Sequence, residues 1–275
     1  MTKLITTILL LLSITLCNAQ YAYFGNRGKI TFDKITFTKA RVRSAAQNSN
    51  SNMMRQGRFN LDNIDESTTK KMVLFFDENS TLLTNQESAE SSSSNSSARV
   101  SGNRAGRYSG RNMARVRINQ NTDRYFYQDL KNNTSEVQLE IDEKYIIKDT
   151  LNNITWRFTD EYREIAGFEC RRVNGSTPDS LYLVAFYTDQ IPVSAGPALS
   201  SGLPGMILGL AIPEMHIQYW ATQVDYTNET VSSQWRDKKA TKLSFEDFVN
   251  SFGRFFQPRG DSNDAKRQVQ EQLIY

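Results

Sequence analysis

The feature that most constrains the fold of this chain is residues 190–212, which read QIPVSAGPALSSGLPGMILGLAI. Pro192 and Pro197 precede a Gly-Leu-Pro-Gly turn at 202–205, and this turn opens directly onto an apolar run. Proline fixes φ and glycine tolerates positive φ, so the segment encodes one loop conformation with little freedom. We interpret it either as a corner that starts a buried strand or as a ligand-contacting loop. The candidate binding residues are Pro192, Gly196, Pro197, Gly202, Leu203, Pro204, Gly205 and Met206.

The first 19 residues follow the plan of a secretory signal peptide. Lys3 precedes an apolar run at 4–16, and Cys17, Asn18 and Ala19 stand before the expected cleavage point. The run is too short to cross a bilayer as a helix, and no longer one follows. We therefore expect an exported chain whose mature form has no transmembrane span. Lipidation of Cys17 is an alternative, but Leu16 stands where a small residue is normally needed.

Composition limits the chemistry and the partners of the mature chain. Removal of residues 1–19 leaves Cys170 as the single cysteine, so no internal disulfide can form and burial must hold the fold together. The remaining length is sufficient for one domain with its own core. The formal net charge is +3 and falls by one with the loss of Lys3, which gives no reason to expect a nucleic-acid partner.

Strand patterns predict a mainly β (α+β) fold. Between 244 and 256 the apolar spacing becomes helical, and Ser244 with Asp247 forms a variant of the capping box. We therefore predict a curved, half-barrel-like antiparallel sheet with a C-terminal helix packed on it. The predicted strands are 29–42, the two arms of a hairpin at 72–83, 114–118, 124–130, 137–147, 155–162, 164–173, 181–188 and 215–224.

The predicted organisation is a signal peptide at 1–19, one domain at 20–256 and a polar tail at 257–275. A Ser/Arg-rich insertion interrupts the domain at about 85–112, and no acidic residue occurs from 91 to 122. Low hydrophobicity with many serines predicts a flexible insertion. Its arginines suggest an alternative role as a contact patch for anionic lipid or polysaccharide.

Several motifs give the chain a resemblance to a known family. A tryptophan strand (Ile154-Thr155-Trp156) is followed by the step at 165–170, IAGFEC, then by the proline segment at 191–197 and by GLPGMI at 202–207. This order resembles the GLPGLI family of secreted Bacteroidetes proteins, with Met206 in place of the usual leucine. The family has no established biochemical activity. The resemblance implies a β-rich exported protein in the periplasm, at the outer membrane or secreted.

Two reactive side chains define the chemical alternatives. Cys170 and His216 could form a Cys/His nucleophilic dyad, and with Met206 and Met215 they are ligands that suit Cu(I). However, Met215 and His216 are neighbours and would point to opposite faces of a strand. The sequence contains no nucleophile elbow, phosphate-binding glycine loop or metal-ligand cluster. We therefore expect no cofactor and no catalytic residue.

These observations favour a non-catalytic binding or accessory protein of the cell envelope. Its expected partner is a hydrophobic or peptide-like ligand, or a transport protein in the outer membrane. The alternative is a copper-handling protein or a hydrolase that uses Cys170 and His216. A structural scaffold with no ligand is a third interpretation.

Overall fold

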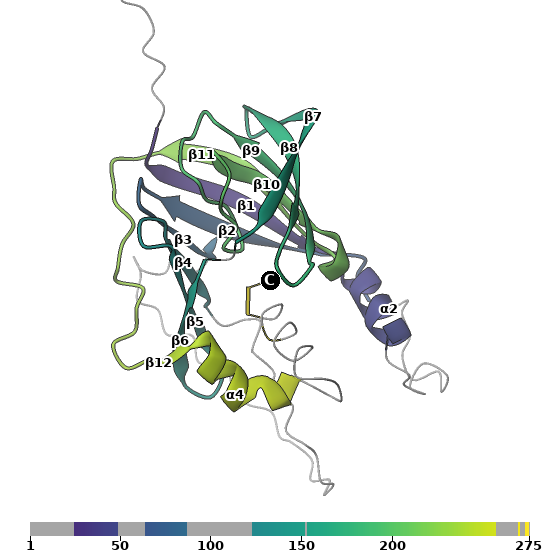
Figure 1. The fold of residues 1–275 in the computed structure, drawn as a ribbon, viewed down its shortest axis with the longest axis vertical. Coiled ribbons are helices and arrows are strands. Elements are labelled where there is room, and N and C mark those ends of the chain that lie inside the picture. Colours follow the sequence, from purple (N-terminus) through teal and green to yellow (C-terminus); the bar gives the residue numbers. More distant parts are fainter. Residues whose placement is uncertain are drawn as a thin grey trace, which may run out of the picture.

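The structure, a computed structural model, describes residues 25–48, 64–86, 123–151 and 153–256, together with Val269, Leu273 and Ile274. Twelve strands form one open sheet, which bends around the C-terminal end and does not close into a barrel (Figure 1). They are β1 (Gly28–Thr36), β2 (Thr68–Phe76), β3 (Ser80–Asn85), β4 (Tyr125–Asp129), β5 (Thr134–Glu140), β6 (Lys144–Thr150), β7 (Thr155–Ile165), β8 (Phe168–Ser176), β9 (Tyr182–Thr188), β10 (Met206–Ile212), β11 (Ile217–Tyr226) and β12 (Thr241–Ser244).

The strand order is β12-β6-β5-β4-β3-β2-β1-β11-β10-β9-β8-β7, and every pairing is antiparallel except that of β12 with β6. The α-helices of the described residues are α2 (Thr38–Asn48) and α4 (Phe245–Phe256), and a 3₁₀ turn, η2 (Pro213–Met215), joins β10 to β11. This architecture confirms the predicted mainly antiparallel sheet with a C-terminal helix.

One face of the sheet, called the inner face below, carries the apolar core. The pairing register places one buried apolar side chain from each of six neighbouring strands in a single row. Burial of each such side chain stabilises the fold by roughly 1.5–3 kcal/mol. An open sheet cannot bury this row against itself, so other segments must cover it. The row consists of Ile30, Leu74, Leu83, Phe126, Val137 and Ile147.

Helix α4 covers the inner face at the β6 end of the sheet. Ser244 caps it, because the Ser244 hydroxyl accepts a hydrogen bond from the Asp247 backbone N–H at 3.1 Å. The ring of Tyr145 meets those of Phe248 and Phe252, with centroids 6.5 Å and 5.2 Å apart. Leu273 and Ile274, from the predicted polar tail, are also buried in this core, whereas most of that tail lies outside the described residues.

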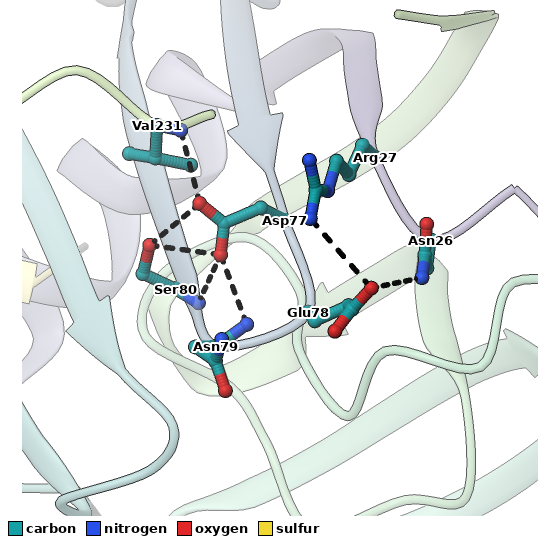
Figure 2. A network of polar contacts seen from close by, with 7 residues as sticks. All are labelled: Asn26, Arg27, Asp77, Glu78, Asn79, Ser80 and Val231. Carbon is teal, nitrogen blue, oxygen red and sulfur yellow. Dashed lines mark hydrogen bonds and ion pairs between the residues drawn. The ribbon is translucent and has the colours of Figure 1, made fainter. Parts of the chain in front are cut away.

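The connection from β11 to β12, residues 227–240, crosses the opposite, outer face and is called the strap below. The Asp77 carboxylate in the β2–β3 turn accepts hydrogen bonds from the N–H groups of Asn79, Ser80 and Val231 and from the Ser80 hydroxyl (Figure 2). Val231 belongs to the strap. Asp77 therefore shapes its own turn and holds the strap against it.

Further along the strap, Arg236 fixes the segment over β4 and β5. Its Nε donates to Glu136 at 2.6 Å, and its guanidinium lies 4.5 Å and 4.4 Å from the ring centroids of Tyr127 and Trp235. Glu136 flanks the inward-facing Val137 and so points to the outer face. Because the strap crosses the sheet before β12 begins, β12 reaches the edge of β6 running in the same direction, and the two strands pair in parallel.

Several predicted boundaries are wrong. The strand predicted at 215–224 begins only at Ile217, because Pro213–Met215 forms η2. The strand predicted at 29–42 ends at Thr36, because helix-forming residues follow and form α2. The strand predicted at 137–147 is two strands, since Asp142 accepts a hydrogen bond from the Glu143 N–H and turns the chain. The break between β7 and β8 lies at Ala166 and Gly167, which both have positive φ. The insertion predicted at about 85–112 starts too early, because Asn85 is the buried last residue of β3. Residues 87–112 of that insertion and the strand predicted at 114–118 lie outside the described residues.

We predict that Glu136→Gln weakens the attachment of the strap. Burial by itself raises the pKa of Glu136, but hydrogen bonds from Lys148 and Arg236 outweigh it and hold this pKa below the ordinary value of 4.5. A lowered pKa in the folded state means that the stabilisation exists above pH 4.5 and is lost as the pH falls through the folded pKa. Urea unfolding at pH 7 should show a loss of about 1–2 kcal/mol.

When the pH falls from 7 to below 4.5, the unfolding free energy of Glu136→Gln should decrease less than that of the parent chain, because the variant has no Glu136 carboxylate to protonate. Glu164→Gln is the matched control, because Glu164 is exposed on β7 and has no ion pair among the described residues. Equal unfolding free energies for the two variants at pH 7 would contradict this role of Glu136.

Candidate functional site

The proline- and glycine-rich segment, residues 190–205, lies across the inner face and is called the signature loop below. Its apolar side chains are buried in the core, including Ile191, Val193 and Leu203. The N–H of Met206 donates to the Ile191 carbonyl at 3.0 Å, and the N–H of Ile207 donates to the Ala195 carbonyl at 2.8 Å. The loop is therefore folded back onto the start of β10 as part of the core.

The signature loop also connects the two halves of the sheet. On one side, Gln128 of β4 donates from Nε2 to the Ser200 carbonyl at 3.3 Å. On the other side, the indole N–H of Trp156 in β7 donates to the Ser201 carbonyl at 2.9 Å. Two consecutive loop residues thus bind strands that are far apart in the sheet order.

Two glycines of the signature loop are required by close contacts. A Cβ on Gly205 would lie 2.0 Å from the Thr188 carbonyl oxygen, and one on Gly196 would lie 2.6 Å from the Ile207 Cβ. Gly202 has a φ of +90° and packs against the Trp156 indole. Structure alone therefore accounts for these residue identities, in agreement with the interpretation of the segment as a corner before a buried strand.

The eight candidate binding residues divide by exposure. Gly196, Pro197, Leu203, Gly205 and Met206 are buried, so they act on a ligand only by shaping the loop. The other three residues reach the surface, and they are Pro192, Gly202 and Pro204.

The exposed side of the signature loop borders three aromatic side chains of β7 and one arginine of β8, together called the aromatic rim below. The four residues are Trp156, Phe158, Tyr162 and Arg171. Phe158 and Tyr162 are 47% and 57% exposed. The Arg171 guanidinium lies 5.4 Å from the Phe158 ring centroid and 5.9 Å from that of Tyr162. The rim is continuous with the signature loop through the hydrogen bond from Trp156.

Arg171 is held in place by polar contacts as well as by the rings. Its Nε donates to the Thr159 carbonyl at 2.7 Å, and its Nη2 lies 3.3 Å from the Asp160 carboxylate. Both partners lie in the bulge of β7, where the register shifts between Phe158 and Tyr162. The sequence did not predict the rim, because polar and apolar residues alternate along β7 as in any ordinary strand. Arg171 comes close to the rings only through the pairing of β8 with β7.

Cys170 and His216 do not form a dyad. Cys170 is the neighbour of Arg171, and the strand pairing places Arg171 opposite Tyr187 of β9. Tyr187 in turn lies opposite Ile207, near the start of β10. His216 lies beyond Ile212 at the other end of β10. Ile207 and Ile212 are five residues apart along β10, which corresponds to about 16 Å at about 3.3 Å per residue.

Each of the two residues has a structural role where it lies. Cys170 is fully buried, and desolvation raises the pKa of its thiol to about 12, so it is protonated at neutral pH. His216 has a φ of +55°, and its Nε2 lies 2.8 Å from the Ser44 hydroxyl of α2. His216 therefore attaches α2 to the β10–β11 turn.

The four soft ligands that suggested copper are likewise separated. Met206 begins β10 in the core, whereas Met215 lies in η2 beside His216. Across the described part of the chain, no group of three or more His, Cys, Asp or Glu side chains could hold a metal ion. None of the helices in that part is both long and apolar enough to cross a membrane.

Residues 101–209 match the model of a family described as a protein of unknown function, Porph_ging. This span includes all four motifs that gave the GLPGLI resemblance and is compatible with it. A comparison with curated proteins finds no match. Among solved structures, two crystal forms of PNGF-II are similar, each at 14% identity and a TM-score of 0.49 over 84% of this chain. The match covers only 34% and 33% of those chains, so this chain spans about a third of their length.

We predict that Gly205→Ala disrupts the signature loop. The added methyl group would overlap the Thr188 backbone, so the loop or β9 must move, at a cost of about 3 kcal/mol in unfolding free energy. Gly167→Ala is the control, because no neighbouring atom lies within 4 Å of the place that its methyl group would take, so only the strain of its positive φ remains. Chemical unfolding should show a loss of only about 1 kcal/mol there. Equal losses would show that the Thr188 contact does not constrain the loop.

Proposed function

We propose that this chain is a non-catalytic binding protein of the cell envelope that holds an extended, peptide-like segment of a partner protein on the aromatic rim. The observation that carries the proposal is the pair of exposed rings, Phe158 and Tyr162, arranged around the fixed guanidinium of Arg171. Aromatic residues and arginine are the residue types that dominate the energetics of protein interfaces.

The rim is unusual on this surface. Among the described residues, the large hydrophobic side chains that are exposed are Phe158, Tyr162, Tyr182 and Tyr226, and two of these four lie side by side on the rim. Arg171 lies over both exposed rings, and Phe158 also meets the ring of Tyr187 edge-on, so the rings lose little conformational entropy on binding. Gly202 of the signature loop extends the same border, since it packs against the Trp156 indole.

A small hydrophobic ligand fits the structure less well than a peptide. The inner face is occupied by the signature loop, α4 and the side chains of Leu273 and Ile274. The apolar hollow that remains beside Leu199 and Phe245 measures about 20 Å³, which is room for about one water molecule. A peptide on the rim requires no displacement of this core.

The partner is expected to bind through side chains more than by extending the sheet. β7 is an edge strand, but its bulge and the charges of Asp160 and Glu161 interrupt the row of backbone groups that a new strand would need. Glu161 is itself paired with Arg172 at 2.6 Å. The rings and Arg171 are therefore the anchors we assign to recognition.

The cellular setting of this proposal comes from the sequence. The signal-peptide pattern at 1–19 supports export to the periplasm or the outer membrane, and it makes an outer-membrane or transport protein the expected source of the peptide-like segment. The separation of Cys170 from His216 leaves the copper and hydrolase alternatives without support.

The experiment places a photo-crosslinking amino acid at Tyr162 in the full chain, expressed in its own envelope. The control places it at Tyr226, which is 41% exposed on β11. We expect one discrete polypeptide adduct from position 162 and none from position 226. Synthetic peptides that cover the crosslinked segment should then bind the purified protein, and Phe158→Ala with Tyr162→Ala should weaken binding by at least about tenfold.

Binding of those peptides that is equal in the parent, the rim double variant and Tyr226→Ala would overturn the proposal. An adduct with lipid alone at position 162 would overturn the peptide-like ligand class.

A further inference from the structure

A second surface feature, independent of the aromatic rim, is a polar cavity at the β2–β3 and β4–β5 turns. We propose that this cavity binds a small zwitterion that carries both a carboxylate and an ammonium group, such as a free amino acid. Its walls come from four separate parts of the chain. They are lined by Arg27, Asp77, Glu78, Asn79, Ser80, Tyr127, Asp129, Lys131, Asn132 and Thr230.

The cavity has the size of a small-ligand site. Its volume of about 250 Å³ is far above the roughly 15 Å³ that one water molecule needs. It lies close to the lower end of the range for small-molecule pockets, which is about 300 Å³. A molecule of about amino-acid size therefore fits the available space.

The walls of the cavity are preorganised by two carboxylates. Asp77 accepts the hydrogen bonds from Asn79, Ser80 and Val231 that Figure 2 shows, and this fixes the β2–β3 turn and the strap. Asp129 accepts hydrogen bonds from the backbone N–H and the side-chain amide of Asn132 at 2.9 Å and 2.8 Å, which fixes the β4–β5 turn.

The two turns are also joined to each other. The N–H of Leu130 donates to the Asn79 carbonyl at 2.8 Å. A ligand therefore enters a site whose shape already exists, so little ordering entropy opposes binding.

Charged groups of both signs remain available at this cavity. Lys131 is exposed and forms no ion pair with any residue that the structure describes. Arg27 lies 3.8 Å from the Glu78 carboxylate, at the long end of the ion-pair range, and Figure 2 shows both side chains beside the Asp77 turn. Glu78 uses one oxygen, Oε1, for both Arg27 and Asn26, and among the described residues its second oxygen has no such contact, so it can face a ligand.

A ligand with both charges matches this set better than a ligand with one. A simple anion would meet Lys131 and Arg27 but would also face Glu78 and Asp129, whereas a simple cation would face the two basic side chains. In a zwitterion, the carboxylate can accept hydrogen bonds from Lys131 or Arg27 while the ammonium group donates to Glu78. Charge-assisted hydrogen bonds of this kind are the stronger ones in proteins.

The test is isothermal titration calorimetry of the full-length protein with each of the common free L-amino acids. The amino acid that binds most tightly is then compared with its methyl ester, which lacks the carboxylate, and its N-acetyl derivative, which lacks the ammonium group. We expect each modification to weaken binding by at least about tenfold, the effect of one charge-assisted hydrogen bond.

Variants assign the two charges to residues. Lys131→Met should weaken binding of the amino acid by at least about tenfold but should barely change binding of its methyl ester. Glu78→Gln should weaken the amino acid but not its N-acetyl derivative. Lys238→Met and Glu164→Gln, which change exposed residues outside the cavity, should leave all affinities unchanged.

Three results would overturn this inference. The first is the absence of binding by every amino acid at about 10 mM. The second is binding that survives both Lys131→Met and Glu78→Gln. The third is a methyl ester or an N-acetyl derivative that binds as tightly as the parent amino acid, which would show that the site reads only one charge.

Discussion

The structure depends on the burial of one apolar face of an open sheet. The row that runs from Ile30 to Ile147 crosses six strands, and no second sheet lies against it among the described residues. The signature loop supplies much of the cover, and α4 supplies more at the β6 end. Because Ser200 and Ser201 bind Gln128 and Trp156, the loop also fixes how the two halves of the sheet are held relative to each other. Burial of this apolar face stabilises the fold without help from Cys170, which forms no disulfide among the described residues.

This constraint determines where function can reside. Residues of the signature loop that looked like candidates for binding, such as Leu203 and Gly205, are committed to the core. The surface of the same loop instead borders Trp156, and from there the aromatic rim continues to Phe158 and Tyr162. The polar cavity lies at the turns of other strands, where Asp77 and Asp129 accept backbone hydrogen bonds and the side chain of Lys131 forms no ion pair with a described residue. Both proposed binding sites therefore lie at the margins of a filled core.

Sequence reasoning predicted the features that local chemistry encodes. The Pro and Gly spacing at 190–205 predicted one rigid loop, and Ser244 with Asp247 predicted the start of α4. It failed where local signals conflict, as at 137–147, where apolar residues on both sides hid the turn at Asp142. The candidate site depends on the register between neighbouring strands, which local sequence patterns do not predict. Arg171 reaches the rings only through the register of β8, and the separation of Cys170 from His216 follows from the direction of β10. Leu273 and Ile274 enter the core although the surrounding sequence is polar.

Native-state hydrogen exchange can show whether the signature loop is part of the folded core. If the signature loop is part of the core, the N–H groups of Met206 and Ile207, which bond to the Ile191 and Ala195 carbonyls, should exchange as slowly as that of Leu74 in β2. All three amides should then exchange only through global unfolding, with the same free energy of opening. Exchange of Met206 and Ile207 as fast as that of Glu143, in the exposed β5–β6 turn, would show that the loop opens independently and would contradict the account.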